Sequence, residues 1–206
     1  QMSEKRPFFT VIVPAHNAEG FIRKTLDSVK MQDFTDYELV VVCDRCTDNT
    51  ASIAREYADL VVEVNFGMDG LARNAGIDFS RGEWILFLDH DDWWMHEYVM
   101  TEIRKFIQAL NGEADLIVFD FLWKGVGYYV NKANRMNIAV WTKAFRREFV
   151  GGTRFPAVKF VSDVDFMNEI LEKRPRCWKL DRLMYYYDYM REGSQTELHG
   201  LGGDSE

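Results

Sequence analysis

The sequence predicts an α/β fold in which a mostly parallel central sheet is flanked by helices and followed by a less regular second half. Short β-branched or aromatic runs alternate with segments of helical period up to about residue 123, a pattern typical of repeated strand–helix–strand units. The runs are apolar along most of their length, as expected for strands that helices cover on both faces. A length of 206 residues fits one domain of ordinary size.

The expected elements of the first half follow one another as strand, helix and strand. Strands are expected at residues 8–13, 37–43, 60–65, 83–88 and 115–122. Apolar residues recur every three or four positions in three stretches between these strands, which predicts helices that pack on the sheet. The helices are expected at residues 22–29, 72–79 and 99–110.

The second half shows weaker patterns. Its expected elements are short strands at 125–130 and 137–145, a helix at 163–173 and an extended aromatic segment at 184–189. Glycine and polar residues dominate positions 191–206, which predicts a flexible tail or lid. Because no linker divides the chain, a single domain over residues 1–206 is expected.

The composition excludes several classes of protein. Lys and Arg number 25 against 33 Asp and Glu, a net charge of −8, so the chain would repel a phosphate backbone and no nucleic acid is expected as a partner. No apolar run approaches the roughly 20 residues that cross a bilayer. The 3 cysteines are too few for a disulfide scaffold, which indicates a reducing compartment.

Polar residues follow three of the expected strands, at the edge where open α/β sheets bind ligands. They occupy residues 14–17, 43–50 and 89–92. The last group places Asp89, Asp91 and Asp92 together after a buried strand. Carboxylates this close repel one another, and a divalent cation such as Mg²⁺ or Mn²⁺ relieves the repulsion. A solvated acidic loop that caps the following helix is the alternative interpretation.

Four motifs occur in order along the first half of the chain. They are Val11-Ile-Val-Pro-Ala-His-Asn17, Asp44-Arg-Cys-Thr-Asp48-Asn-Thr50, Ala72-Arg-Asn-Ala-Gly76 and Gly82-Glu-Trp-Ile-Leu-Phe-Leu-Asp-His-Asp-Asp92. Together they resemble the inverting family 2 glycosyltransferases of GT-A fold. The resemblance is close over about residues 8–112, which would be the nucleotide-sugar half, and looser over about residues 113–190, which would be the acceptor half.

The resemblance implies which residues hold the sugar donor, a UDP-sugar. Pro14, Ala15 and Asn17 would line the nucleotide pocket together with Asp44, which would meet the base or the ribose. Arg73 would contact the base or brace Asp44 and the acidic cluster.

The family's metal motif matches Asp89 and Asp91. The resemblance makes Asp91 the more direct ligand of a Mg²⁺ or Mn²⁺ ion that bridges the donor diphosphate. Arg191 belongs to a segment similar to the one with which the family closes over that diphosphate.

The general base of the family lies in a Glu-Asp pair that opens a helix of the acceptor half. Ser162 and Asp163 match this pair, so Asp163 is the expected base and Asp165 the second candidate. A helix cap at Ser162 or Asp163 is the alternative, and both roles are compatible. Trp141 and Lys143 match a Trp-x-Lys element beside the acceptor site, where core packing of the tryptophan is the alternative.

The chain departs from the family pattern in the second motif. Cys43 replaces the usual Asp, and Arg45 and Cys46 replace Gly-Ser, which changes the details of base recognition but keeps Asp44. The resulting Cys-x-x-Cys is also the spacing of a redox dithiol or of half a zinc site. Both interpretations are disfavoured because Cys177 is far along the chain and no second pair exists.

The expected activity is therefore metal-dependent transfer of a sugar to the hydroxyl of a saccharide or lipid-linked saccharide, with inversion at the anomeric carbon. A cytoplasmic protein is expected, with peripheral association at the inner face of the membrane when the acceptor is lipid-linked. A sugar-nucleotide nucleotidyltransferase is an alternative, but it would carry a Gly-rich loop after the first strand. A non-catalytic nucleotide-sugar-binding homologue is another, which loss of Asp91 or Asp163 would have supported.

Overall fold

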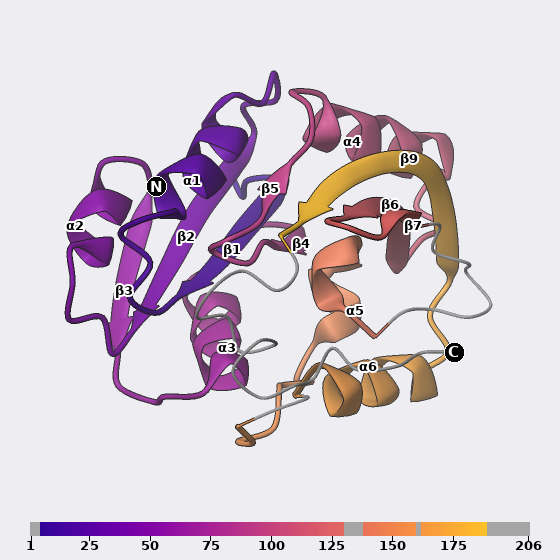
Figure 1. Ribbon diagram of the computed structural model, residues 1–206. Helices are drawn as coiled ribbons and strands as arrows, with labels where there is room; N and C mark the ends of the chain where they lie inside the picture. The colour runs from indigo at the N-terminus through magenta and orange to yellow at the C-terminus, as the bar shows by residue number, and fades with distance from the viewer. Residues whose placement is uncertain (1–4, 130–137, 160–161, 189–206) are drawn as a thin grey trace.

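The computed structural model describes residues 5–129, 138–159 and 162–188. Within these ranges a nine-stranded sheet in the order β3-β2-β1-β4-β8-β6-β9-β5 runs through the molecule, with β7 paired to β6. Helices cover both faces of this sheet (Figure 1). The structure confirms the α/β fold expected from the sequence.

The first half contains the parallel part of the sheet. Its elements are β1 (Phe9–Ala15), α1 (Ile22–Lys30), β2 (Tyr37–Asp44), α2 (Thr50–Arg55), β3 (Leu60–Val64), α3 (Asp69–Phe79) and β4 (Trp84–Phe87). β1 lies between β2 and β4 and is parallel to both, and β2 is parallel to β3. A helix follows each of β1, β2 and β3 in the chain, as the crossover connections of parallel strands require.

The second half extends the same sheet with mostly antiparallel pairs. Its elements are β5 (Trp93–Trp94), α4 (Val99–Ala109), β6 (Leu116–Trp123), β7 (Gly127–Tyr129), the 3₁₀ turn η1 (Val140–Thr142), β8 (Lys143–Arg146), α5 (Arg147–Val150), α6 (Ser162–Glu172) and β9 (Cys177–Tyr187). β8 lies antiparallel between β4 and β6, and β9 pairs parallel to β6 and antiparallel to β5. The two halves therefore share one sheet.

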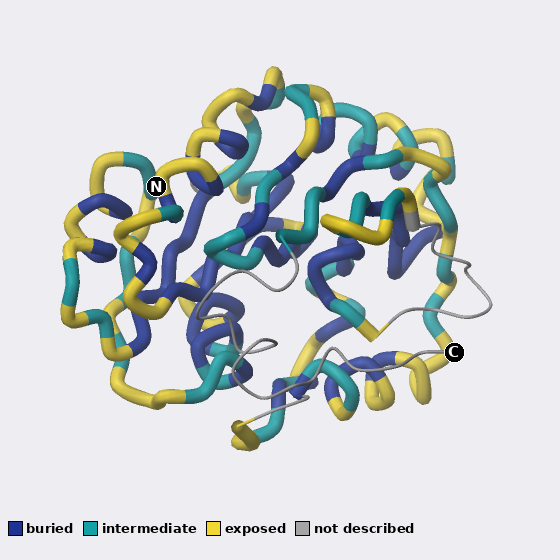
Figure 2. The backbone as a smooth tube through the Cα atoms, in the orientation of Figure 1, coloured by how far each residue is buried: buried dark blue, intermediate teal, exposed yellow. Residues whose placement is uncertain are grey.

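The core has one layer on each face of the sheet. On one face, apolar side chains of α1, α2 and α4 pack against β1, β2 and β4. On the other, α5 and α6 pack against β4, β6 and β8, and α3 packs against β1, β2 and β4. The central strands are buried along their length, as Figure 2 shows in dark blue.

A glycine sets the distance between α3 and the sheet. A Cβ atom at Gly76 would overlap the side chain of Ile12 in β1. The absence of a side chain therefore lets α3 close onto the sheet and brings Arg73, one turn earlier, near the carboxyl end of β4.

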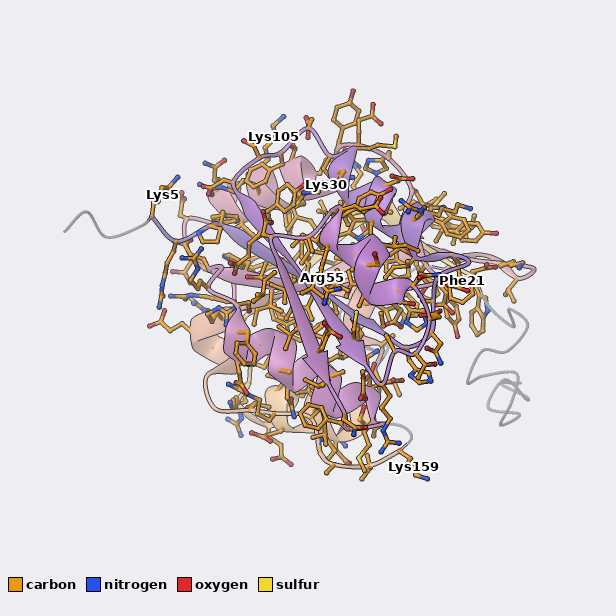
Figure 3. All side chains as sticks on the ribbon, turned by 90° about the vertical axis from the view of Figure 1, so that its left-hand side faces the viewer. Lys5, Phe21, Lys30, Arg55, Lys105 and Lys159 are labelled. Atoms are coloured by element: carbon orange, nitrogen blue, oxygen red, sulfur yellow. The ribbon has the colours of Figure 1, made fainter. Side chains whose placement is uncertain are left out.

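The edge strand β3 is shielded by charge. Arg55 of α2 forms an ion pair with Glu63 of β3, and Figure 3 looks onto this edge with Arg55 in front. Charged side chains along an edge oppose pairing with other chains. The labelled Lys5, Lys30 and Lys105 are all exposed, and Lys5 lies at the left of the same view.

The structure corrects several expected boundaries. Pro14 and Ala15 are the last residues of β1, where a turn was expected. The expected strand at 137–145 is a 3₁₀ turn followed by β8, and the expected segment at 184–189 is the end of the longer strand β9. The short elements α2 and β5 were not expected, because six and two residues carry too little periodicity to be recognised.

Among the described residues, no helix is long and apolar enough to span a bilayer. Residues 191–206, including Arg191, lie outside the described residues.

Candidate active site

The ends of three parallel strands and the starts of two helices meet at one edge of the sheet. β1, β2 and β4 are adjacent and parallel, so the residues that follow them lie at the same edge. α3 and α6 also begin here, where a Cβ at Gly70 would lie 3.0 Å from the Cβ of Ser162. Helix N-termini carry partial positive charge and favour anions.

Arg73 joins the two halves of the molecule at this edge. Its Nη2 donates to Oδ1 of Asp89 at 2.8 Å, and its Nη1 lies 3.5 Å from Oδ1 of Asp163. The guanidinium is buried, with 8% of its side chain exposed, and it lies over the ring of Phe155 at 5.7 Å. One cation therefore holds a carboxylate of the acidic loop and a carboxylate of α6 together.

The structure separates the two base candidates. Asp163 lies in the first turn of α6, 20% of its side chain is exposed, and its Oδ2 accepts the backbone N–H of Val140 at 3.3 Å. Asp165 is exposed to solvent, because a residue two positions along a helix points to another face. The network around Arg73 contains Asp163 and not Asp165.

The acidic loop after β4 contains two buried carboxylates, Asp89 and Asp92, whose pKa values are both raised. Burial raises the pKa of Asp89, Arg73 opposes this shift, and the charges of Asp91 and Asp163 add to it. Burial also raises the pKa of Asp92 well above its usual range, as do the nearby charges of Asp91 and Asp89. The mutual repulsion expected from the sequence is therefore present.

Asp92 anchors the end of β9 to the acidic loop. Its two oxygens accept the hydroxyl of Tyr185 at 2.6 Å and the backbone N–H of Asp188 at 2.8 Å. The same hydroxyl accepts the backbone N–H of Asp89 at 3.3 Å. Sequence reasoning missed this role of Tyr185, since one tyrosine in an aromatic run carries no signal of its partner.

The acidic loop fits a hard divalent cation that substrate would help to hold. Within residues 5–129, 138–159 and 162–188, no group of three or more His, Cys, Asp or Glu side chains is arranged to hold a metal ion. Mg²⁺ usually binds one or two carboxylates and completes its shell with water and substrate phosphates. Asp89 and Asp91 supply carboxylates of this type, and their repulsion favours a cation.

The ends of β1 and β2 lie side by side at the edge expected to hold the nucleotide. Pro14 and Ala15 are buried, so the exposed residues after β1 are His16 and Asn17. Asn17 has a left-handed backbone, with φ 44°, and its Oδ1 accepts the backbone N–H of Thr47 at 2.8 Å. The two strand ends are thereby tied to each other.

Asp44 supports the loop that leads into α3. Its two oxygens accept the backbone N–H groups of Phe66 at 2.7 Å and of Met68 at 3.0 Å. Asp44 is 5% exposed, and these two bonds fix the loop between β3 and α3 at this edge.

The Trp-x-Lys element is buried beside Asp163. Trp141 stacks on Tyr185 and Tyr187, with ring centroids 4.5 and 5.0 Å away, so it packs in the core and offers no open face to a sugar. The Nζ of Lys143 donates to the backbone oxygen of Ala139 at 2.6 Å and to Oγ1 of Thr142 at 3.0 Å. Burial lowers the pKa of Lys143 to about 7, against the attraction of Asp163.

Lys143 is expected to make folding stability depend on pH. Below about pH 7 the amine of Lys143 is charged in both the folded and the unfolded chain, so the free-energy cost of burying its charge is fully present. Between pH 7 and its unfolded pKa of 10.5 the folded chain binds fewer protons, so stability rises by at most about 1.4 kcal/mol per pH unit. Urea unfolding of Lys143→Met at pH 7 and 9 should lack this rise, whereas the exposed Lys105→Met should keep it. Equal pH dependence in all three chains would contradict the assignment.

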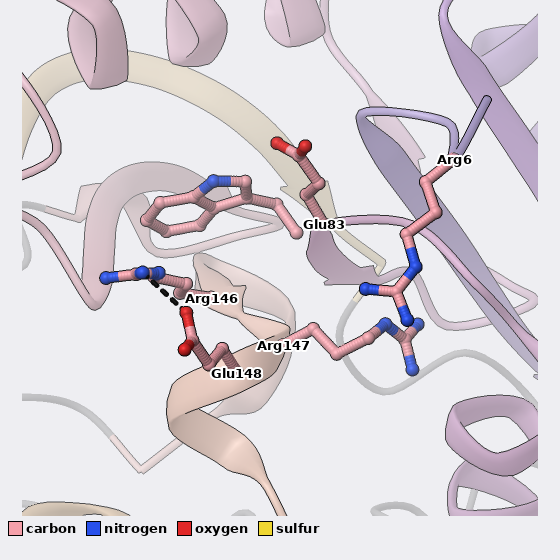
Figure 4. Close-up of a pocket in the computed structure, with 6 residues that line it drawn as sticks. Arg6, Glu83, Arg146, Arg147 and Glu148 are labelled. Carbon is pink, nitrogen blue, oxygen red and sulfur yellow. Dashed lines mark hydrogen bonds and ion pairs between the residues drawn. The ribbon is translucent and has the colours of Figure 1, made fainter.

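A pocket of about 640 Å³ lies at the opposite end of β4 (Figure 4). It is lined by Arg6, Glu83, Trp84, Arg146, Arg147 and Glu148. Arg147 donates to the backbone oxygens of Gly82 and Ile77 and to Oγ of Ser80, and Arg146 pairs with Glu148. These bonds tie α5 to the start of β4, away from the acidic loop.

Comparison with known proteins places the chain among glycosyltransferases. The family model Glycosyl transferase family 2 matches residues 10–167. Glycosyltransferase GlyA of Streptococcus pneumoniae is 35% identical over 92% of this chain and 31% of its own length. Poly(ribitol-phosphate) beta-N-acetylglucosaminyltransferase TarS of Staphylococcus aureus is 35% identical over 53% of this chain and 20% of its own length.

The crystal structure of S. aureus TarS 1-349 in complex with UDP-GlcNAc is similar to this fold. It superposes with a TM-score of 0.80 at 26% identity, covering 92% of this chain and 60% of that one. The chain spans about a third of the length of GlyA and a fifth of TarS. Its motifs, its fold and the family match agree, and the chain belongs to glycosyl transferase family 2 with a GT-A fold.

Proposed function

We propose that the chain transfers a sugar from a UDP-sugar to an acceptor hydroxyl, with inversion at the anomeric carbon and with Mg²⁺ or Mn²⁺. The observation that carries this proposal is the contact of Arg73 with both Asp89 and Asp163, 2.8 and 3.5 Å away. It brings the metal-motif loop and the candidate base to one point. The similarity to TarS, whose structure holds UDP-GlcNAc, supports the choice of a UDP-sugar.

The donor would lie across the ends of β1, β2 and β4. Asn17 and Asp44 would hold the nucleoside, with Pro14 and Ala15 behind them in the wall of the crevice. The diphosphate would lie near the starts of α3 and α6, whose dipoles favour its charge. Arg191 would close over it from the segment that follows β9.

Asp89 and Asp91 would hold the cation. When bound, the cation neutralises charge on the diphosphate and makes it a better leaving group. Among the described residues, Nε of Arg73 is buried without a hydrogen-bond acceptor. This N–H would be satisfied by an oxygen of the bound donor.

Asp163 would act as general base. Its carboxylate would take the proton of the acceptor hydroxyl while the oxygen attacks the anomeric carbon on the face opposite the nucleoside diphosphate. The C–O bond to the diphosphate breaks as the new glycosidic bond forms, so one displacement inverts the configuration. Arg73 and the N–H of Val140 would orient Asp163 for this step.

The acceptor would be a saccharide or lipid-linked saccharide bound by the second half of the chain, about residues 113–190. A lipid-linked acceptor would require peripheral contact with the inner face of a membrane. In this proposal residues 1–206 act as one glycosyltransferase domain, because both halves contribute strands to one sheet.

Asp91→Asn tests the donor site. We expect it to weaken UDP binding in the presence of Mn²⁺ by at least about tenfold, about 1.4 kcal/mol, because an amide is a weaker cation ligand than a carboxylate. Calorimetry with and without Mn²⁺ measures this, and Asp165→Asn is the control that removes an exposed carboxylate elsewhere. Equal affinity of the parent and Asp91→Asn with Mn²⁺ present would refute the metal assignment.

A further inference from the structure

Cys43 and Cys46 lie together where β2 ends. Cys43 is 1% exposed and pairs in register with Ala15 of β1. Arg45 has a left-handed backbone, with φ 55°, and this turn returns Cys46 towards Cys43. The Sγ of Cys46 contacts the backbone oxygen of Ala15, which is the register partner of Cys43, so both cysteines lie beside the same residue of β1, and both are free.

The two thiols have different environments. Cys46 is half-buried, and its Sγ donates to the backbone oxygen of Ala15 at 3.5 Å. The side chain of Cys43, the backbone N–H of Asn17 and the charge of His16 lower the pKa of Cys46 to about 7, against its partial burial and the charge of Asp48. The contact with Cys46 and burial raise the pKa of Cys43 well above its usual range. Cys46 is therefore the nucleophile of the pair, since the thiolate is the reactive form.

We propose that Cys43 and Cys46 form a redox modification site that reacts with low-molecular-weight disulfides and closes to an intramolecular disulfide. The Cys46 thiolate attacks one sulfur of the small disulfide, forming a mixed disulfide and releasing a small thiolate. That thiolate takes the proton of Cys43, whose sulfur then attacks Cys46 and releases the second small thiolate, which takes a proton from water. Two protein thiols are oxidised, and one small disulfide is reduced to two thiols.

The structure favours a redox dithiol over a zinc site at Cys43 and Cys46. The distance to Cys177 along the chain and the lack of a second pair argue against a zinc site, but a dithiol needs neither. What it needs is an accessible thiol of low pKa beside a second thiol, and the turn at Arg45 supplies that arrangement. The pair occupies positions where the chain departs from the family pattern.

Oxidation would change the nucleotide crevice, a consequence that rests on the proposed function. A disulfide brings its sulfurs to about 2.05 Å and removes the S–H that Cys46 donates to the backbone oxygen of Ala15. Asp44 lies between the two cysteines, and its carboxylate holds the N–H groups of Phe66 and Met68. We expect oxidation to lower UDP affinity about tenfold, about 1.4 kcal/mol, and a reductant to restore it.

The test of the site needs no nucleotide. The folded chain is incubated with oxidised glutathione, and its thiols are counted by alkylation and peptide mass spectrometry. We expect loss of two of the 3 thiols, with a peptide containing Cys43 and Cys46 that is two hydrogens lighter and carries no glutathione. Retention of all the thiols, or reaction first at Cys177, would refute the proposal.

Single variants identify the order of reaction. Cys43→Ala should keep one glutathione on Cys46, because no second thiol resolves the mixed disulfide. Cys46→Ala should leave Cys43 unmodified, because Cys43 is only 1% exposed and a small disulfide cannot reach its sulfur. Cys177→Ala is the matched control and should behave as the parent, since burial raises the pKa of Cys177 to about 11. If Cys43 in Cys46→Ala takes up as much glutathione as Cys46 does in Cys43→Ala, Cys46 is not the nucleophile.

UDP binding to the reduced and oxidised chains separates the two proposals. Binding to the reduced chain and weaker binding to the oxidised chain supports both. Equal binding to the two forms refutes the coupling to the crevice. Failure of the reduced chain to bind UDP refutes the proposed donor, while the thiol count still decides the redox site.

Discussion

Replacing Asp163 by Asn is expected to lower kcat by about 10² to 10⁴ with little change in donor affinity. An amide cannot accept the acceptor proton, but it preserves the size of the side chain and an oxygen for the N–H of Val140. Because the proposed donor site lies beyond β1, β2 and β4, donor affinity should not depend on this proton. Initial rates with a UDP-sugar and a saccharide acceptor measure kcat, and calorimetry with UDP measures affinity.

Asp165→Asn is the matched control for this experiment. Asp165 is on the same helix and carries the same charge, but it is exposed and outside the contacts of Arg73. We expect its kcat to stay within about threefold of the parent, which corresponds to well under 1 kcal/mol. A slow Asp165→Asn beside a near-parental Asp163→Asn would move the base two residues along α6.

Replacing Arg73 by Met is expected to destabilise the fold by about 2 to 4 kcal/mol at pH 8, below the about 3 to 5 kcal/mol of a fully buried ion pair because both carboxylates keep some contact with solvent. The guanidinium is nearly buried, whereas Asp89 and Asp163 are 23% and 20% exposed. Without it two carboxylates stay close together with no cation between them. Urea unfolding of the parent and the variant measures the loss.

The stability lost in Arg73→Met should grow as the pH rises. Burial already raises the pKa of Asp89, and Arg73 opposes that shift, so its removal raises the pKa further. A folded-state pKa above the unfolded value favours the protonated folded form, so the variant is least destabilised at low pH. Stability is then lost as the pH rises through the folded pKa.

Arg154→Met is the control for this prediction. Arg154 forms an ion pair with Asp78 in which both side chains are at least a third exposed, and such pairs contribute about 0 to 1 kcal/mol. Parental stability of Arg73→Met at pH 8 would contradict a role for Arg73 in balancing the two carboxylates.

Much of the first half could be predicted from local sequence. β1, β2 and β4 are apolar runs, and α3, Asp69–Phe79, contains the third motif. Long, strongly periodic segments are the ones that pattern identifies. The polar residues after each strand also lie at one edge, because neighbouring parallel strands end at the same edge.

The second half depended on pairing that the local pattern does not specify. β9 has an irregular exposure pattern, and it becomes a strand because it pairs along β6 across two register shifts. β8 is short and follows a 3₁₀ turn, and it is fixed by its place between β4 and β6. Sheet pairing over long sequence separations decided these elements.

The sequence by itself determined the α/β class, the polar strand ends and the family to which these motifs belong. Only the tertiary structure decided that Arg73 joins Asp89 to Asp163, that Asp165 faces solvent, and that Cys46 returns to Cys43. The physical reason is that motifs report the chemistry and period of neighbouring residues. Contacts between residues far apart in the chain arise from the packing of α3 and α6 on one sheet, which no local pattern contains.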